Sequence, residues 1–309
     1  MKKIKWDKKG KIFEQTGNGI FKSHATRPVP VKLNERVLRI FFTSRDDDDM
    51  PLPTFIDVNI ENPSELLSVN KKKMIDFGQP GAFDDSGVTI GSIIYDHGKV
   101  MAYYSGWKRR RFKVTIEMSI GLLEFDEQLS TLTKVYEGPI LAQDKEHPFL
   151  VCAPFAIHDG VYKMWYCSGT GWEQVGEKPE MMYRINYAES EDGIDWKVKS
   201  SPAVDYAYHG EVLSSPWVIK GEKDWHMWYS VRGITKKKYV AGYAASPDGV
   251  HWTRFDDKAG LEVSDNGWDS EMACYPAFFT HKDFTYMFYS GNNVGKGGLG
   301  YAVSKNIFL

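Results

Sequence analysis

One stretch of this sequence occurs twice. Residues 185–196 read INYAESEDGIDW and residues 241–252 read AGYAASPDGVHW, so both contain a Tyr-Ala pair, a Ser-x-Asp-Gly turn and a closing tryptophan. A weaker third copy, LGYAVSKN, begins at Leu299 and lacks the half that carries the tryptophan. Self-similarity of this kind indicates a repeated supersecondary unit whose copies pack on one another.

The amino-terminal residues can supply the missing half. Residues 4–13 read IKWDKKGKIF, and Trp6 precedes charged and apolar residues much as Trp252 does. We therefore expect Trp6 to occupy the position of Trp196 and Trp252. An N-terminal strand within residues 1–15 would then complete the last repeat, and this closure would remove exposed strand edges.

Alignment of the repeats gives five units, each with an inner strand and a second strand that is rich in aromatic residues and ends in a serine. The inner strands are expected at residues 23–31, 85–94, 149–157, 211–219 and 271–279. Four prolines align within them: Pro28, Pro154, Pro216 and Pro276. A spacing of about 60 residues suits four strands with their loops, and no long helical periodicity intervenes.

These features predict an all-β fold, a five-bladed β-propeller closed by the N-terminal strand. We expect residues 1–309 to form a single domain. A β-sandwich is the other all-β possibility, but a sandwich does not need a repeat of this length.

Composition limits the classes of partner. The protein has 39 Lys and Arg against 41 Asp and Glu, which argues against a nucleic-acid partner. Its three cysteines, Cys152, Cys167 and Cys274, suggest neither a disulfide framework nor a thiolate zinc site. No apolar run approaches the roughly 18 residues of a spanning helix. We expect a cytoplasmic protein without a membrane partner, and the sequence carries no signal of oligomeric state.

Candidate catalytic residues come from the starts of the inner strands, which converge in a propeller. Glu211 and Glu271 each lie five residues before an aligned proline, and Asp85 lies close to the corresponding level. Paired carboxylates suit general acid and base catalysis, and a carboxylate in an apolar strand is costly unless it faces a wet cavity. We predict that Asp85, Glu211 and Glu271 are catalytic. For the glutamates, a role as buried structural partners is the alternative.

Other polar residues at the same level have different predicted roles. Asp84 and Asp269 are expected to tie neighbouring blades through hydrogen bonds to backbone. Substrate binding is predicted for His24, Arg27, Arg45, Trp107, His147, His209 and Arg232. The arginine guanidinium is suited to binding an anionic group such as phosphate or carboxylate. The faces of Trp107, Trp172 and Trp268 suit a sugar ring, with packing under loops as the alternative.

The histidines allow one more interpretation. His24, His147 and His209 are expected at comparable heights on three blades, but they lack a recognisable ligand spacing. We therefore predict no metal site and no cofactor.

The inner strands and the YAxSxDGxxW turns resemble the five-bladed propeller glycoside hydrolases, namely the arabinanase/xylosidase, invertase-like and mannoside-phosphorylase families. The resemblance covers nearly the whole chain. For the first two families it implies an Asp directly before the proline of blade 1, another before that of blade 3, and a Glu two residues before that of blade 4. This protein has Arg27, Ala153 and Ser214 at those positions. The family mechanism therefore does not transfer residue by residue.

Two functions fit this departure, and both take a small-molecule sugar or an oligosaccharide as partner. In the one we favour, the acids have moved, and Asp85, Glu211 and Glu271 process a glycosidic, phosphorylated, nucleotide-linked or acidic sugar by hydrolysis or phosphorolysis. In the other, catalysis is lost and the cavity only binds a glycan or sugar metabolite. A scaffold that uses the rim of the propeller for protein partners is a third, less supported possibility. Fold alone does not decide among them.

Overall fold

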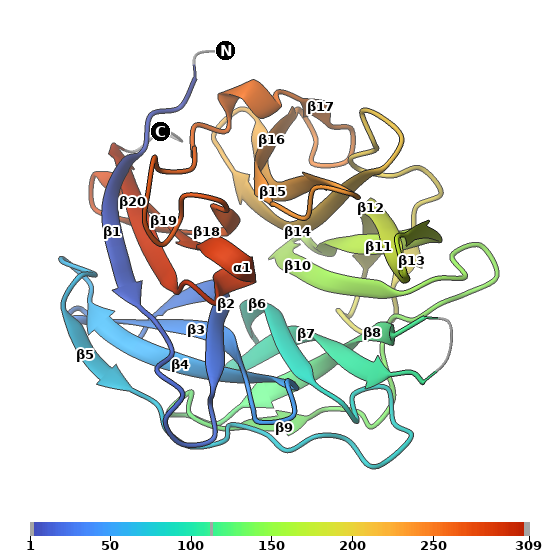
Figure 1. Ribbon diagram of the computed structural model, residues 1–309, viewed down its shortest axis with the longest axis horizontal. Helices are drawn as coiled ribbons and strands as arrows, with labels where there is room; N and C mark the ends of the chain where they lie inside the picture. The colour runs from blue at the N-terminus through green and yellow to red at the C-terminus, as the bar shows by residue number, and fades with distance from the viewer. Residues whose placement is uncertain (1–2, 112–113, 306–309) are drawn as a thin grey trace. The chain divides into compact units, whose positions relative to one another are not determined.

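A computed structural model describes residues 3–111 and 114–305 of the protein. Its strands form five four-stranded sheets, and every strand pair with a described register is antiparallel. Each sheet is one blade, and Figure 1 shows the strands with their labels. The predicted all-β five-bladed propeller is therefore confirmed.

The strands of each blade have the following bounds. Blade 1 contains β2 (Ser23–Lys32), β3 (Val37–Arg45), β4 (Pro51–Asn59) and β5 (Leu66–Val69). Blade 2 contains β6 (Val88–Asp96), β7 (Lys99–Arg109), β8 (Ile116–Phe125) and β9 (Leu132–Lys134). Blade 3 contains β10 (Val151–Asp159), β11 (Val161–Val175), β12 (Lys178–Ser190) and β13 (Lys197–Val198).

The last two blades differ in how they are assembled. Blade 4 contains β14 (Glu211–Lys220), β15 (Trp225–Gly233), β16 (Val240–Ser246) and β17 (Thr253–Arg254). Blade 5 has the order β18 (Cys274–His281), β19 (Phe284–Ser290), β20 (Leu299–Lys305) and β1 (Asp7–Phe13). The described helices are short: the 3-10 helix η1 (Asp256–Lys258) and α1 (Asn292–Gly295).

The protein divides into two compact units. The first unit is Met1–Lys72, Trp217–Val231 and Lys238–Leu309, and the second is Lys73–Pro216 and Arg232–Lys237. Blades 5 and 1 lie wholly in the first unit, and blades 2 and 3 lie wholly in the second. The expectation of a single domain stays a prediction.

The amino-terminal strand completes blade 5, as predicted. β1 pairs antiparallel with β20, and the two run side by side at the edge of the sheet (Figure 1). Trp6 meets the ring of Trp228 edge-on at 6.4 Å and 79°. In the other unit, Trp196 meets Tyr103 at 5.7 Å and 79°. Trp6, Trp196 and Trp252 each directly precede the outer strand of their blade, as the predicted equivalence requires. Met1 and Lys2 of the predicted strand lie outside the described residues.

The repeated Ser-x-Asp-Gly segment is a tight turn. Ser190 Oγ accepts the Gly193 N–H at 2.9 Å, and Ser246 Oγ accepts the Gly249 N–H at 2.8 Å. Both glycines have positive φ, 73° and 77°, a conformation that glycine adopts without steric cost. Backbone hydrogen bonds, the Asp195 N–H first, hold the pKa of Asp192 below its ordinary value. The repeat thus encodes a turn of the fold.

Apolar and aromatic side chains fill the sheets of both units. Trp228 and Phe41 are fully buried in the first unit, and Trp165 and Tyr103 in the second. All three cysteines are buried free thiols, as expected of small core residues. Among residues 3–111 and 114–305, no helix has the length and apolar character needed to cross a membrane.

Candidate functional site

The inner strands share a backbone irregularity directly before their aligned prolines. Positive φ angles between 51° and 56° occur at Arg27, Ala153, Ser215 and Tyr275. The strand register shifts at this point in β2, β10 and β18, which defines a β-bulge. Left-handed non-glycine residues cost about 1–3 kcal/mol and gather at functional sites. Arg27 and Ala153 are also two of the positions at which the resemblance implies catalytic acids.

Arg27 and Tyr275 meet in the first unit. The Arg27 guanidinium lies 4.6 Å from the centre of the Tyr275 ring, and the Tyr239 ring lies 5.5 Å from the same ring. Both tyrosines are buried, whereas Arg27 is partly exposed. Burial raises the pKa of the Cys274 thiol, and the nearby Arg27 charge opposes this rise. The two bulge residues therefore form a cation–aromatic stack near a neutral, buried thiol.

His24 lies three residues before Arg27 on β2 and is also left-handed, with a φ of 66°. Burial lowers its pKa to about 4, with Arg45 and Lys296 contributing in the same direction and Asp49 against it. The Arg45 Nη1 donates hydrogen bonds to the backbone oxygen of Asp49 at 2.8 Å and to its carboxylate at 3.3 Å. His24 is thus a neutral hydrogen-bonding group near two cations.

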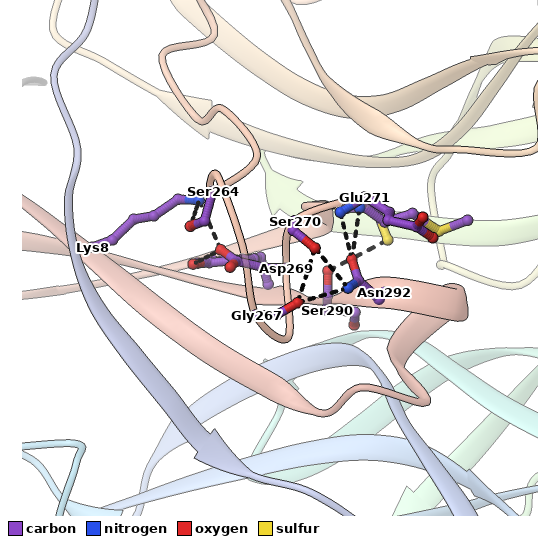
Figure 2. Close-up of polar contacts among 11 residues, drawn as sticks. Lys8, Ser264, Gly267, Asp269, Ser270, Glu271, Ser290 and Asn292 are labelled. Atoms are coloured by element: carbon purple, nitrogen blue, oxygen red, sulfur yellow. Dashed lines mark hydrogen bonds and ion pairs between the residues drawn. The ribbon is translucent and has the colours of Figure 1, made fainter.

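Glu271 lies before β18 and not within it. The prediction that it sits in an apolar strand is wrong, because the Asn292 side chain takes the place of strand pairing here. Asn292 Oδ1 accepts the N–H groups of Glu271 and Met272 at 2.7 and 3.0 Å, as Figure 2 shows. The Glu271 side chain is 48% exposed and pairs with Lys238 at 3.0 Å. Glu271 is therefore an accessible carboxylate on a fixed backbone.

Glu211 and Asp85 belong to the second unit. Glu211 begins β14, is 2% exposed, and accepts the Ala207 N–H at 2.7 Å. Glu211 and Glu271, equally distant from aligned prolines, therefore have different environments. Asp85 accepts hydrogen bonds from the Gly81 N–H at 2.9 Å and from the Ser86 hydroxyl at 2.6 Å. That Asp85, Glu211 and Glu271 share one cavity stays a prediction.

Arg232 is a buried cation of the second unit. Its Nη2 donates to Glu180 Oε2 at 3.3 Å, and Lys237 contacts the other oxygen of the same carboxylate. Its Nη1 donates to the backbone oxygen of Gly233 at 3.3 Å. Arg232 thus forms part of a charge cluster, and its predicted role in substrate binding stays a prediction.

The remaining predicted histidines pair with carboxylates. His147 Nδ1 lies 3.1 Å from Asp144, and His209 Nε2 lies 3.1 Å from Glu173. His209 is 85% exposed at its side chain, whereas His147 is 14% exposed. Within residues 3–111 and 114–305, no three His, Cys, Asp or Glu side chains are grouped to hold a metal ion.

The three tryptophans predicted to stack on a sugar are half-buried. Trp107 lies within β7, which continues to Arg109, and its backbone N–H donates to the Gly87 oxygen at 2.8 Å. Trp172 lies inside β11 and packs against a buried cluster. Trp268 stacks on Tyr289 with ring centres 5.1 Å apart. These contacts favour packing over sugar stacking for Trp172 and Trp268.

Asp84 joins strands of blade 2 and is fully buried. It accepts the Tyr104 hydroxyl hydrogen of β7 at 2.9 Å and pairs with Lys134 of β9 at 2.7 Å. Burial, followed by the Asp84 charge, raises the pKa of Tyr104. The structural role predicted for Asp84 therefore takes a different form, since these partners are side chains of its own blade.

Asp269 repeats this arrangement in blade 5. It pairs with Lys8 of β1 at 2.7 Å, as Figure 2 shows, and it accepts the Tyr289 hydroxyl hydrogen at 2.9 Å. The side chain of Asp269 is 3% exposed. Lys8 thereby joins the N-terminal strand to the blade through a largely buried ion pair.

Four residues of the first unit were not predicted from the sequence. They are Tyr275, Tyr239, Lys238 and Asn292. Tyr275 had a signal, because it precedes Pro276 as Arg27 precedes Pro28. Lys238 and Tyr239 lie in the β15–β16 connection, outside any repeat. Asn292 acts through a loop whose geometry only the folded protein reveals.

Comparison with known proteins bears on the family and the fold. No protein-family model matches the sequence. The "Uncharacterized protein Rv1502" of Mycobacterium tuberculosis is 32% identical over 306 residues, which cover 97% of this chain and 99% of the relative.

Solved propeller structures are similar along almost the whole length of the protein. A structure described as that of "a glycosyl hydrolase from Bacteroides ovatus" has a TM-score of 0.74 at 14% identity, and the match covers 99% of this protein and 94% of that one. A structure reported for "the GH130 family of mannoside phosphorylases" has a TM-score of 0.67 at 14% identity, covering 99% and 95%. "Crystal structure of a thermostable family-43 glycoside hydrolase" has a TM-score of 0.63 at 15% identity, covering 94% and 92%. The protein thus has the fold of the five-bladed propeller glycoside hydrolases.

Proposed function

The protein belongs to the family of the uncharacterized protein Rv1502 of Mycobacterium tuberculosis, and we propose that it is a carbohydrate-active enzyme whose substrate is a sugar with an anionic group. The observation that carries the proposal is the stack of Arg27 on Tyr275. Both residues occupy strained bulges at the aligned position before proline. The same strain occurs at Ala153 and Ser215, so the side chains of Arg27 and Tyr275 distinguish this site from the other bulges.

Two further cations act on His24, which lies three residues before Arg27, and they support an anionic ligand. Arg45 and Lys296 act on the same histidine, His24, and burial keeps that imidazole neutral at neutral pH by lowering its pKa. A guanidinium binds carboxylate or phosphate oxygens in a planar, two-point geometry. A neutral imidazole and a tyrosine ring add hydrogen bonding and an aromatic surface, which suit a sugar.

Glu271 is the carboxylate of the first unit that is best suited to general acid or base catalysis. It is accessible, its backbone is held by Asn292, and it lies four residues before Tyr275. In this proposal Glu271 transfers a proton during glycosidic or phosphoryl-sugar cleavage, with Arg27 holding the anionic group. Glu211 is the more buried candidate, on a different unit, and its part in the proton transfers stays a prediction.

A binding test separates recognition from turnover. Glucose 6-phosphate, glucuronate and a nucleotide-linked glucose would be compared with glucose by titration calorimetry, and product formation would be followed with and without added phosphate. We expect anionic sugars to bind at least about tenfold more tightly than glucose, and Arg27→Met to abolish this preference. Equal binding of glucose and its anionic forms would contradict the proposed ligand class.

Separate substitutions test the proposed catalytic role of Glu271. We expect Glu271→Gln to lower turnover by about 100-fold or more with binding nearly unchanged, as expected for the loss of a general acid or base. Glu61→Gln, which alters an exposed surface ion pair in the same unit, is the matched control. Turnover that survives in both Glu271→Gln and Glu211→Gln would contradict the catalytic assignment.

A non-catalytic sugar-binding protein is the second candidate, and one observation favours it. Each predicted catalytic carboxylate already has a partner within the protein. Asp85 accepts hydrogen bonds from Gly81 and Ser86, Glu211 accepts one from the Ala207 N–H, and Glu271 forms an ion pair with Lys238. Binding of anionic sugars without turnover on any of them would select this function.

A further inference from the structure

One serine of each second strand has no role in the proposed function. The prediction that these strands end in the serine is wrong for β3, β7, β11 and β15, which continue beyond it, and right for β19. The serines are Ser44, Ser105, Ser168, Ser230 and Ser290, which we call the bulge serines, and each is at most 2% exposed. A buried hydroxyl group is costly unless it is hydrogen-bonded. The partners of three of these serines indicate why a hydroxyl is placed there.

Three bulge serines accept a hydrogen bond from the bulge residue of the following blade. Ser290 Oγ accepts the Arg27 N–H at 3.1 Å, and Ser230 Oγ accepts the Tyr275 N–H at 2.7 Å. In the second unit, Ser105 Oγ accepts the Ala153 N–H at 2.8 Å. All three donors are left-handed residues.

The bulge explains why these N–H groups need a serine. At a register shift the extra residue leaves the pattern of strand pairing, so its N–H loses its usual partner. The proline that follows each bulge residue has no N–H to contribute. The serine hydroxyl of the preceding blade therefore satisfies a donor that strand pairing leaves over, and it supports a strained backbone.

Two of these contacts converge on Arg27. Ser290 holds the backbone from which the Arg27 side chain departs. Ser230 holds the backbone of Tyr275, whose ring lies 4.6 Å from the Arg27 guanidinium. Ser290 also lies two residues before Asn292, whose side chain holds the Glu271 backbone (Figure 2).

We propose that Ser290 and Ser230 are positioning residues, which set the orientation of Arg27 toward an anionic group of the ligand. This proposal rests on the proposed function for the ligand, whereas the hydrogen bonds themselves do not. Ser105 provides a matched control, because it makes the same contact to Ala153, whose methyl side chain cannot bind an anion.

The first experiment needs no ligand. Amide hydrogen exchange would be measured by NMR on the full chain and on Ser290→Ala, Ser105→Ala and Ser290→Thr. We expect the Arg27 amide to lose about tenfold or more of its protection in Ser290→Ala, and the Ala153 amide to do so in Ser105→Ala. Ser290→Thr keeps a hydroxyl and should retain protection. Unchanged protection of Arg27 in Ser290→Ala would overturn the proposal.

The second experiment uses glucose 6-phosphate and glucuronate as probes in titration calorimetry. We expect Ser290→Ala to bind them about tenfold more weakly, and Ser105→Ala to bind within about twofold of the parent protein despite a similar loss of thermal stability. Equal losses in the two variants would overturn the positioning role. If Ser290→Ala does not fold, Ser230→Ala is compared with Ser105→Ala under the same criterion.

The two experiments test the ligand class and the hydrogen bonds independently of one another. If the parent protein binds neither probe, the proposed ligand class is wrong and the positioning role falls with it. The exchange measurement would still decide whether the serine hydroxyls hold the bulges.

Discussion

Blades 5 and 1 join one another in the same way as blades 2 and 3, but the side chains at the junctions differ. Ser290 accepts the Arg27 N–H at the first junction, and Ser105 accepts the Ala153 N–H at the second. Three residues before the bulge, blade 1 has the polar His24, whereas blade 3 has the buried Leu150. The shared backbone therefore belongs to the fold, and the charged side chains distinguish the first junction from the second.

The largest effect is expected from deletion of residues 1–12, which removes the outer strand of blade 5 and leaves blades 2 and 3 intact. The deletion removes Lys8 from the buried Asp269 carboxylate and Trp6 from Trp228, so it breaks a largely buried ion pair and an aromatic contact together. We expect loss of cooperative unfolding or a large fall in Tm by circular dichroism. A truncated protein that melts and refolds like the full chain would show that β1 is dispensable.

The two buried ion pairs allow a finer comparison of blades 2 and 5. Lys134 and Asp84 are 12% and 0% exposed at their side chains, against 25% and 3% for Lys8 and Asp269. We expect Lys134→Met to lower the unfolding free energy by about 3–5 kcal/mol and Lys8→Met to lower it somewhat less. The reason is that the more buried carboxylate, Asp84, is less hydrated when it is left without its lysine. Urea unfolding measures both.

Lys282→Met is the control for these ion pairs. It breaks an exposed pair with Glu61, and no measurable change in unfolding free energy is expected. A loss in Lys282→Met as large as that in Lys134→Met would show that burial does not cause the difference.

The smallest effect is a pH dependence at the first junction. Burial lowers the pKa of His24 to about 4 from 6.5, so the unfolded chain takes up this proton first as the pH falls. The contribution of His24 to stability is therefore complete above pH 6.5 and is lost between pH 6.5 and 4. His24→Asn keeps a residue that tolerates positive φ but removes the titration.

Unfolding free energies of the parent protein and His24→Asn would be compared between about pH 7 and pH 4. We expect the parent protein to lose about 1 kcal/mol relative to the variant across this range, after allowance for solvent screening of a partly exposed ring. A difference between the two proteins that does not change with pH would contradict the neutral state of His24.

Part of the candidate site was predictable from aligned positions. Arg27 was found from its place before Pro28, and the same rule applied to Pro276 would have found Tyr275. Glu271 was placed in a strand because its segment is apolar, but the Asn292 side chain replaces strand pairing there. A side chain that substitutes for backbone pairing leaves no periodic pattern in the sequence.

By itself, the sequence determined the propeller, its number of blades and the use of the N-terminal strand, because these depend on repeated turns and on the local preferences of glycine, proline and tryptophan. Only the tertiary structure decided the partners of Asp84, Asp269 and the bulge serines. These contacts join residues far apart in the chain, as Ser290 and Arg27 are, and the pairing depends on which blades become neighbours. Long-range hydrogen bonds of this kind follow from the folded geometry, which the one-dimensional pattern does not contain.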